Sequence, residues 1–546
     1  MSEIPATQFA IQFVGKDEVR INPAKPMYEV GPHQLLLKTE AVGICFSDTK
    51  LLHQFDSHAR KSDVLAGLTP EQLAEIPSYQ PGSLPVVPGH EAVGRIVAVG
   101  SEVVHHEVGE RVLVQTDYRH LPTKSSNAAF GYNFDGALQE YVVLDERMIL
   151  DPADEERFLI PVSDTPTASA VALVEPWACV EAAYAWGERQ TLKAGGRLLV
   201  VAESAPAQGV AELVAASAPG AIVVVGEADV DGEKVSSLDE VEGRFDDIVY
   251  VGSDAATIER LGDLLGFGAV LDIVLAGGQI DRAVQVDVGR VHYDLIRYTG
   301  TAGSSAAEGY ARIPAEAEIR GGDRIAIVGA AGPMGLMHTV RTAVSGVEGV
   351  VMDAIDVDDS RLAHLAEVVA PIAERAGVPA RFLNSKSAPL EPGYSYVALM
   401  VPAPPLVTQA IDISGENTIV NAFAGFPIGT MASLDMQAIV TKGIYMVGTS
   451  GSRIVDMKVM LSKVESGQLD TNVSLWAVCG MAGVKDAIDS VNNRTSGGKI
   501  MVYPQLHDLG LVRLSDLPEK LPEVAAAMTD GLWNHDAERA LLATAS

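Results

Sequence analysis

A buried-type strand, a glycine-rich turn and a helix start follow one another at 324–335, and this segment restricts the fold more than any other. The strand reads Arg-Ile-Ala-Ile-Val, and the turn carries Gly329, Gly332 and Gly335. Glycines there let the backbone approach a pyrophosphate that lies at the helix N-terminus. The strict G-x-G-x-x-G pattern is imperfect, because Ala330 stands at its first position. The segment predicts a dinucleotide-binding unit built on a parallel sheet.

An acidic residue at the end of the next strand indicates which dinucleotide would bind. Asp356 follows Gly335 by 21 residues, close to the spacing of about 20 at which an acid binds the ribose diol. A carboxylate at this place repels a 2′-phosphate. We therefore expect NAD(H) rather than NADP(H).

The same pattern of landmarks occurs twice in the chain. Segments 193–201, 228–231, 245–250 and 298–303 resemble, in this order, 320–328, 355–358, 394–399 and 446–451. We interpret this as an internal duplication, with copy one at 190–317 and copy two at 318–455. Similar strand composition without duplication is the alternative.

The two copies differ at the glycine turn. Aligned by position, Ala205 replaces Gly332 and Gln208 replaces Gly335, and Glu203 adds a carboxylate facing the expected phosphate position. Side chains keep backbone N–H groups away from a pyrophosphate. Copy one is therefore predicted not to bind a dinucleotide and to serve as a structural or interface module.

Residues before about 185 alternate short strands with Gly/Pro turns and suggest a small β-rich body. Within it, Cys45, Gly89-His90-Glu91 and Glu175 offer the sulfur, nitrogen and oxygen donors that hold a catalytic zinc with one position open. Each has an ordinary alternative: a buried structural cysteine, a satisfied histidine, a carboxylate at a helix start. Ser47 could relay a proton, and Asp48 could orient a ligand histidine. Cys179 could approach the metal, but helix packing is preferred.

The composition restricts the classes of partner that the protein is expected to bind. The chain has 546 residues and a formal net charge of −32, which argues against nucleic acid. Its three cysteines cannot form a disulfide framework, so a reducing compartment is expected. No apolar run approaches the ~20 residues of a membrane span, and no signal peptide is evident. We expect a cytoplasmic protein that does not bind membranes.

These motifs together resemble the zinc-containing medium-chain dehydrogenase/reductase family, closest to its L-sorbose-1-phosphate reductase and sorbitol dehydrogenase branch. The resemblance is carried by the segments 174–179, 331–335, 356–362, 448–451 and 496–500. It implies an α/β fold class with a GroES-like catalytic domain at 1–189 and a Rossmann domain at 318–455. Residues 456–546 would return to the catalytic domain and end in a helical tail. The inserted, degenerate Rossmann-like unit at 190–317 departs from the family pattern, and so does the missing four-cysteine zinc lobe.

The resemblance also implies residue roles. Cys45, His90 and Glu175 would bind zinc with Glu91 as an exchangeable fourth ligand, and Ser47 would relay the proton. The cofactor contacts would be Gly332, Pro333, Met334, Gly335, Asp356, Arg361, Val401, Ala424, Gly448 and Lys499. A homo-oligomer is expected for this family.

A zinc site and a hydride carrier in one chain indicate alcohol–carbonyl redox chemistry. We predict a zinc-dependent, NAD-linked oxidoreductase acting on a polyol, a sugar or a sugar phosphate. The alternatives are a dehydrogenase of a simpler or aromatic alcohol, or a non-catalytic NAD-binding protein. Lys50, His53, Arg60 and Lys61 could form a phosphate pocket or a solvated basic loop.

Overall fold

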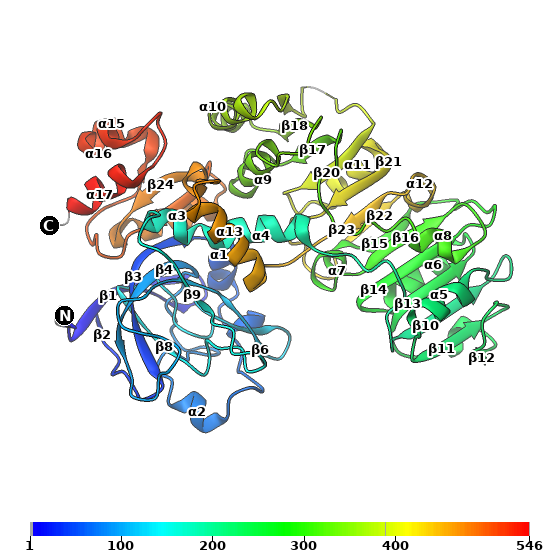
Figure 1. Ribbon diagram of the computed structural model, residues 1–546, viewed down its shortest axis with the longest axis horizontal. Coiled ribbons are helices and arrows are strands. Elements are labelled where there is room, and N and C mark those ends of the chain that lie inside the picture. Colours follow the sequence, from blue (N-terminus) through cyan, green and yellow to red (C-terminus); the bar gives the residue numbers. More distant parts are fainter. Residues whose placement is uncertain (1–3, 388, 545–546) are drawn as a thin grey trace. The chain divides into compact units, whose positions relative to one another are not determined.

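The computed structural model describes residues 4–387 and 389–544 and separates into two compact units. The first unit joins Met1–Cys179 to Ser452–Ser546, and the second is Val180–Gly451 (Figure 1). The chain therefore leaves the first unit, builds the second and returns. The expected boundary between 190–317 and 318–455 lies inside the second unit, while residues 452–455 of the second range belong to the first unit.

The first unit is rich in antiparallel strands. Its largest sheet has the order β26-β24-β25-β3-β4-β5-β9, with β8 also paired to β3. The strands are β1 Thr7–Gly15, β2 Glu18–Pro26, β3 Gln34–Ile44, β4 Glu91–Val99, β5 Arg111–Val114, β6 Asp117–Pro122, β7 Asn127–Ala129, β8 Tyr141–Asp145, β9 Leu159–Pro161, β24 Leu475–Cys479, β25 Lys499–Val502 and β26 Val512–Arg513. The helices are α1 Phe46–His53, α2 Pro70–Ala74, α3 Ala168–Ala172, α13 Ile454–Glu465, α14 Val484–Asn492, α15 Leu517–Lys520, α16 Pro522–Ala527 and α17 His535–Ala543. Helix α4 Val174–Ala185 begins in the first unit and ends in the second.

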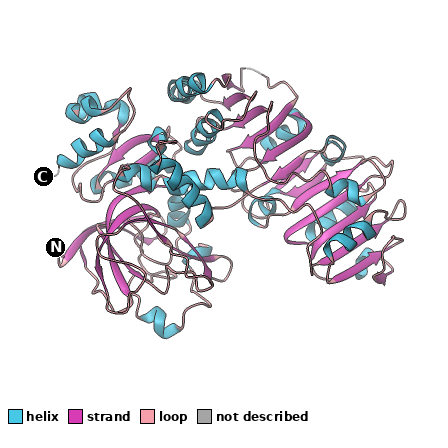
Figure 2. Cartoon of the chain, in the orientation of Figure 1, coloured by secondary structure: helices cyan, strands magenta, loops and turns pink. Residues whose placement is uncertain are grey.

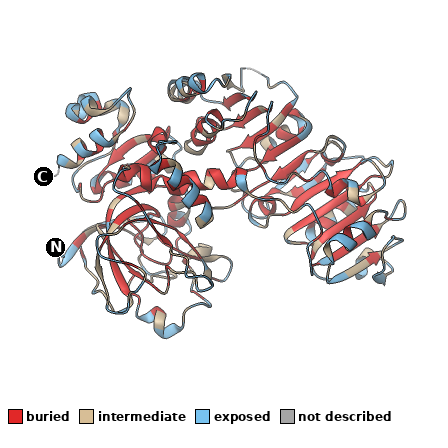
Figure 3. Cartoon of the chain, viewed as in Figure 1, coloured by how far each residue is buried: buried red, intermediate tan, exposed pale blue. Residues whose placement is uncertain are grey.

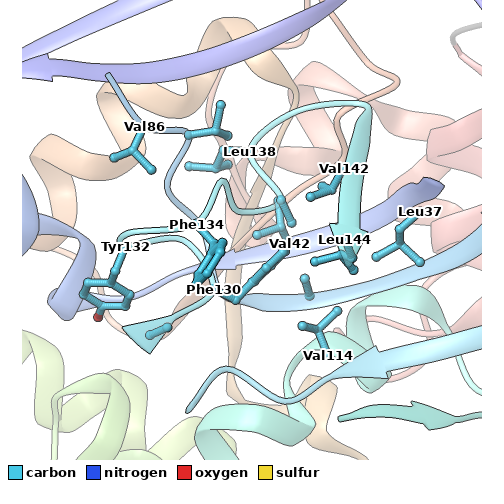
Figure 4. Packing of buried hydrophobic residues seen from close by; sticks show 14 of the residues in the cluster. Leu37, Val42, Val86, Val114, Phe130, Tyr132, Phe134, Leu138, Val142 and Leu144 are labelled. Carbon is cyan, nitrogen blue, oxygen red and sulfur yellow. The ribbon is translucent and has the colours of Figure 1, made fainter. Parts of the chain in front are cut away.

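A core of aliphatic and aromatic side chains fixes the register of these strands. Leu37 and Val42 of β3 pack with Val142 and Leu144 of β8 and with side chains of the 130–138 loop (Figure 4). Removing this apolar surface from water stabilises the pairing of β3 with β4. That pairing sets Gly43 opposite Glu91, which brings the two halves of the predicted metal site together.

The second unit contains two six-stranded parallel sheets with equivalent strand order. One is β12-β11-β10-β13-β14-β16 and the other is β19-β18-β17-β20-β21-β23. Copy one consists of β10 Arg197–Ala202, α5 Val210–Ser217, β11 Ala221–Val225, β12 Glu233–Val235, β13 Phe245–Val251, α6 Ala255–Asp263, β14 Leu265–Val274, β15 Val284–Asp287, α7 Val288–Tyr293, β16 Arg297–Thr301 and α8 Ala306–Tyr310. Copy two consists of β17 Arg324–Val328, α9 Pro333–Ala343, β18 Val351–Asp356, α10 Asp359–Ala376, β19 Ala380–Asn384, β20 Tyr394–Leu399, α11 Pro404–Ile413, β21 Ser414–Asn421, β22 Met431–Leu434, α12 Met436–Lys442 and β23 Tyr445–Val447.

The predicted fold class, a β-rich domain with parallel-sheet nucleotide-type units, is confirmed. Helices pack against the strands of both parallel sheets (Figure 2). Their central strands, β10 and β17, are buried along most of their length (Figure 3), as parallel strands covered on two faces should be. Among the described residues, no helix has the length and apolar character needed to cross a bilayer.

A buried carboxylate distinguishes the two parallel sheets. Asp272 of β14 is fully buried, and neither of its oxygens has a hydrogen-bond partner within the described residues. Burial raises the pKa of Asp272 well above its usual value, opposed by Arg312 and reinforced by Glu308. The corresponding strand of copy two has Asn421, whose amide donates to the Ala183 carbonyl and to the Tyr396 hydroxyl oxygen.

Asp272→Asn should therefore stabilise the protein at alkaline pH. Above the unfolded-state pKa of about 4 the unfolded chain releases the Asp272 proton while the folded chain retains it, so stability falls as pH rises. We expect a gain of about 1–2 kcal/mol near pH 8 that shrinks towards pH 5. Thermal melting at the two pH values measures it. The exposed Asp281→Asn should change stability little, and a loss of stability in Asp272→Asn at pH 8 would contradict the expectation.

Candidate active site

The end of β3 and the start of β4 carry the predicted metal ligands. Cys45 is the N-terminal capping residue of α1, directly after β3, and Glu91 is the first residue of β4. The ligand atoms of Cys45, His90 and Glu91 all lie within 4.8 Å of one another. Strand pairing thus brings together a thiol, an imidazole and a carboxylate from two separate sequence motifs.

The first turn of α1 orients the imidazole. His90 Nδ1 lies 3.1 Å from Asp48 Oδ1, and His90 Nε2 lies 3.2 Å from Ser47 Oγ. Burial opposes protonation, but the charge of Asp48 raises the pKa of His90 well above its usual value. A neutral His90 that donates its Nδ1 proton to Asp48 would present Nε2 as a ligand beside the Ser47 hydroxyl.

Glu91 has one oxygen bound and one unpaired. Lys499 Nζ donates to Glu91 Oε1 and, over 3.2 Å, to the Ile44 carbonyl. Glu91 Oε2 is buried without a hydrogen-bond partner in the described part of the chain. Gly43 makes room for this oxygen, since a Cβ at that position would lie 2.1 Å from it. An unpaired buried carboxylate oxygen beside a thiol and an imidazole fits a zinc ion.

Glu175 lies outside the group whose ligand atoms are within 4.8 Å, but it belongs to the same electrostatic neighbourhood. Burial raises the pKa of Glu175 to about 7, with His90 lowering it and Glu91 raising it. Cys179, one turn later on α4, places its Sγ 3.8 Å from Glu175 Oε1. Glu175 is therefore close enough for the charges of His90 and Glu91 to shift its pKa.

No sequence motif indicated the aromatic ring and the ion pair that lie around His90. Tyr132 lies with its ring centroid 5.6 Å from that of His90, and the Arg60 guanidinium lies 5.5 Å from the Tyr132 centroid. Arg60 is also ion-paired with Asp117 over 2.5 Å. Tyr132 and Asp117 come from loops and short strands that carry no recognisable motif.

Two of the basic residues considered for a phosphate pocket are already bound to groups of the protein. Lys61 is buried and donates to the carbonyls of Gln80 and Leu84, at 2.7 Å each. His53 is bound to Asp17 and Asn492. Among these candidates Arg60 is the one that contacts the surroundings of His90, through Tyr132.

In the second unit, the predicted cofactor residues follow the carboxyl ends of parallel strands. Gly329–Gly335, Asp356, Val401, Ala424 and Gly448 follow or end β17, β18, β20, β21 and β23, respectively. Ligands of open α/β sheets bind at this edge. Lys499, by contrast, belongs to β25 of the first unit, where it contacts Glu91.

The glycine turn of copy two is tightly closed. Gly329 has φ of +82°, and a Cβ on Gly335 would lie 2.3 Å from the Gly329 carbonyl oxygen. Gly332 caps α9, and Pro333 begins that helix. Asp356 Oδ2 accepts from the Ala331 N–H over 3.1 Å, while the Arg361 guanidinium donates to the Ala331 carbonyl over 2.7 Å. The turn, the acid and Arg361 thus form one connected structure.

The position-by-position alignment of the two turns is wrong. The turn between β10 and α5 is longer than that between β17 and α9, and Gly209 caps α5 as Gly332 caps α9. Ala205 and Gln208 therefore lie within the longer turn and do not replace Gly332 and Gly335. The error arose because counting residues from a strand does not reveal how long the following turn is.

A carboxylate of the protein occupies the helix start in copy one. Asp229, which corresponds to Asp356, accepts from the N–H groups of Gly209, Val210 and Ala211 at 2.7, 3.2 and 3.1 Å. Glu203 instead accepts from the hydroxyls of Tyr250 and Thr257. Amides that would bind a phosphate are thus already paired with an internal anion.

Comparison with known proteins places these features among dehydrogenases. The family described as "Alcohol dehydrogenase GroES-like domain" matches residues 31–154. The mannitol-1-phosphate 5-dehydrogenase of Aliivibrio fischeri is 28% identical over 251 residues, which are 42% of this chain and 58% of that protein. The sorbitol dehydrogenase of Bos taurus is 26% identical over 276 residues, 49% of this chain and 67% of that protein.

The chain spans less than two thirds of the length of the first curated relatives that it matches. Among solved structures, the 2R,3R-butanediol dehydrogenase of Bacillus subtilis has a TM-score of 0.50 and 16% identity, covering 91% of this chain and 100% of that chain. This last likeness concerns the fold.

Proposed function

Because the chain belongs to the medium-chain dehydrogenase/reductase family, near its sorbitol dehydrogenase branch, we propose that it is a zinc- and NAD-dependent oxidoreductase. Its substrate would be a polyol, a sugar or a sugar phosphate, interconverted between alcohol and carbonyl forms. The observation that carries this proposal is the group of Cys45, His90 and Glu91, whose ligand atoms lie within 4.8 Å of one another. A protein that only bound NAD would have no use for such a group.

The chain's own residues would prepare the reacting oxygen. Cys45, His90 and either Glu91 or Glu175 would hold a zinc ion, and the chemistry supplied there would be polarisation of the substrate oxygen and a lower pKa of the alcohol. Asp48 holds the His90 ring in place. Ser47 lies beside His90 Nε2 and would accept the alcohol proton and pass it outward. Lys499 donates to Glu91. Glu91 would act as an exchangeable zinc ligand by exchanging Lys499 for the metal as its partner.

Copy two would bind the NAD. The N-terminus of α9 after Gly332 would receive the pyrophosphate, and Asp356 would bind the ribose diol. Arg361, Val401, Ala424 and Gly448 would complete the contacts. The chemistry that NAD would supply when bound is hydride exchange with the substrate carbon.

Asp356→Ala should weaken the preference for NAD⁺ over NADP⁺. The substitution removes the charge that repels a 2′-phosphate and leaves Arg361 nearby, so the ratio of the two kcat/KM values should fall about tenfold, or ~1.4 kcal/mol. Asp359→Ala removes a charge from the start of α10, the helix that carries Arg361, and should leave the ratio unchanged. Equal use of the two cofactors by the unaltered protein would contradict the assignment.

A substrate screen tests the proposed function. The full chain, with its zinc content measured on the same sample, would be offered polyols, sugar phosphates, and aliphatic and aromatic alcohols with NAD⁺, and NADH formation would be followed. We expect the highest kcat/KM with a polyol, a sugar or its phosphate. Preference for a simple or aromatic alcohol would favour the alternative function, a dehydrogenase of such alcohols. NAD binding without turnover of any alcohol would overturn the proposal.

A further inference from the structure

The contact between the two copies in the second unit is reciprocal. Strand β15 of copy one pairs antiparallel with β22 of copy two, and these strands occupy equivalent places in the two copies. The last strands, β16 and β23, also contact each other, while α7 contacts β23 and α12 contacts β16. Each copy therefore offers the same elements to the other (Figure 1).

The pairing register has the symmetry of a twofold axis. Asp287 caps α7 and Asp435 caps α12, so these residues define the equivalence of the two copies. Counted back from them, Val284 is equivalent to Ala432 and Val286 to Leu434. Val284 pairs with Leu434, and Val286 pairs with Ala432. When the two copies are exchanged, each of these pairings becomes the other.

The residues between these two pairs lie on the axis itself. Gln285 pairs with Ser433, and both precede the capping aspartate by two residues. Their side chains are hydrogen-bonded to each other. A residue that meets its own counterpart is what a twofold contact requires at its centre.

A close glycine contact occurs in the same reciprocal way. A Cβ on Gly300 would lie 2.9 Å from Val440 Cγ2, and a Cβ on Gly448 would lie 2.9 Å from His292 Cα. Gly300 and Gly448 are equivalent in β16 and after β23, and His292 and Val440 each follow the capping aspartate by five residues. Each copy thus packs its glycine against the other's helix.

A third pair of contacts repeats the pattern. A Cβ on Gly289 would lie 2.7 Å from Ile428 Cα, and the Ile280 N–H donates to Gln437 Oε1 over 2.9 Å. Gly289 and Gln437 each follow the capping aspartate by two residues, and Ile280 and Ile428 each precede it by seven. Side chains from both copies also form one hydrophobic cluster.

Joining two copies in tandem does not by itself impose this geometry, since head-to-tail stacking would bring unlike surfaces together. A self-complementary contact is the kind that one copy makes with a second identical copy. We infer that copy one occupies, within the same chain, the place of a second subunit at the β22–β23 edge of the NAD-binding sheet. It covers an edge that would otherwise pair with another chain. An oligomer of this chain would then use another surface.

Cysteine cross-linking in the full chain tests which partner lies at the edge. In Gln285→Cys/Ser433→Cys, mild oxidation should give a disulfide within one chain, seen as a single-chain mass on a non-reducing gel and located by peptide mapping. Ser433→Cys alone should give no cross-link. An interchain dimer joined through Cys at 433 in the single variant would show that a second chain already occupies the edge, and the inference would be wrong.

Displacing copy one tests whether the edge is competent to bind a second chain. Val286 is buried opposite Ala432, so Val286→Arg should undock copy one and double the mass measured by light scattering. Adding Ser433→Cys to this variant should then give an interchain disulfide. The exposed Ala283→Arg, directly before β15, is the control and should keep the mass of the unaltered protein. A Val286→Arg protein that keeps the mass of the unaltered protein and binds NADH normally would contradict the inference. If Val286→Arg fails to fold, the double cysteine variant decides.

Discussion

Replacing Cys45 with serine should remove the bound zinc and lower the rate of NADH formation by at least about a thousandfold, or ~4 kcal/mol. The thiolate is the softest donor in the Cys45, His90 and Glu91 group, and a neutral hydroxyl is a much poorer zinc ligand. The fold should survive, because Cys45 caps α1 and serine is a favourable capping residue. Elemental analysis and circular dichroism on one sample separate loss of metal from loss of structure.

Cys179→Ser is the matched control for this prediction. Cys179 is a half-buried free cysteine like Cys45, and it lies next to Glu175. We assign it to helix packing, so its variant should keep one zinc per chain and most of the activity. Retention of zinc and activity by Cys45→Ser, or two tightly bound zinc ions in the unaltered protein, would refute the assignment of a single catalytic site.

Local sequence patterns predicted the parts of the site that lie close along the chain. Cys45, Ser47 and Asp48 fall on one strand-to-helix turn, and a cysteine in that context, with Gly89-His90-Glu91 further on, indicated the metal site. The pairing of Lys499 with Glu91 joins residues separated by most of the chain. No local pattern encodes such a pair, because the return of 452–546 to the first unit creates it.

The comparison of the two copies shows where sequence reasoning fails. Hydrophobic strand patterns predicted both parallel sheets, since buried strands require apolar residues whatever the turns between them do. The turn lengths were not predictable in this way, and Gly209 was therefore overlooked as the cap of α5. The role of Asp229 depends on where its side chain points, which composition does not specify.

The copies should differ in cofactor binding despite their common topology. Calorimetric titration of the full chain with NADH should give one site per chain. In copy two the α9 start is capped by Gly332. A Cβ placed there would lie 3.3 Å from the Arg361 guanidinium and 3.7 Å from the Gly329 carbonyl oxygen. In copy one the corresponding amides already pair with Asp229. A phosphate would have to displace the Asp229 carboxylate from these amides, and the negative charge of Asp229 would repel it.

Gly335→Val should abolish this single site, lowering affinity by at least about a hundredfold, or ~2.7 kcal/mol. A Cβ at Gly335 would lie 2.3 and 2.5 Å from the carbonyl oxygens of Gly329 and Ala330, so the turn would have to open and its amides would leave the pyrophosphate. Glu203→Ala in copy one should leave both affinity and stoichiometry unchanged, because Glu203 contacts Tyr250 and Thr257 rather than the α5 start. Two sites in the unaltered chain, or one that persists in Gly335→Val and disappears in Glu203→Ala, would assign NADH to copy one and reverse the roles of the copies.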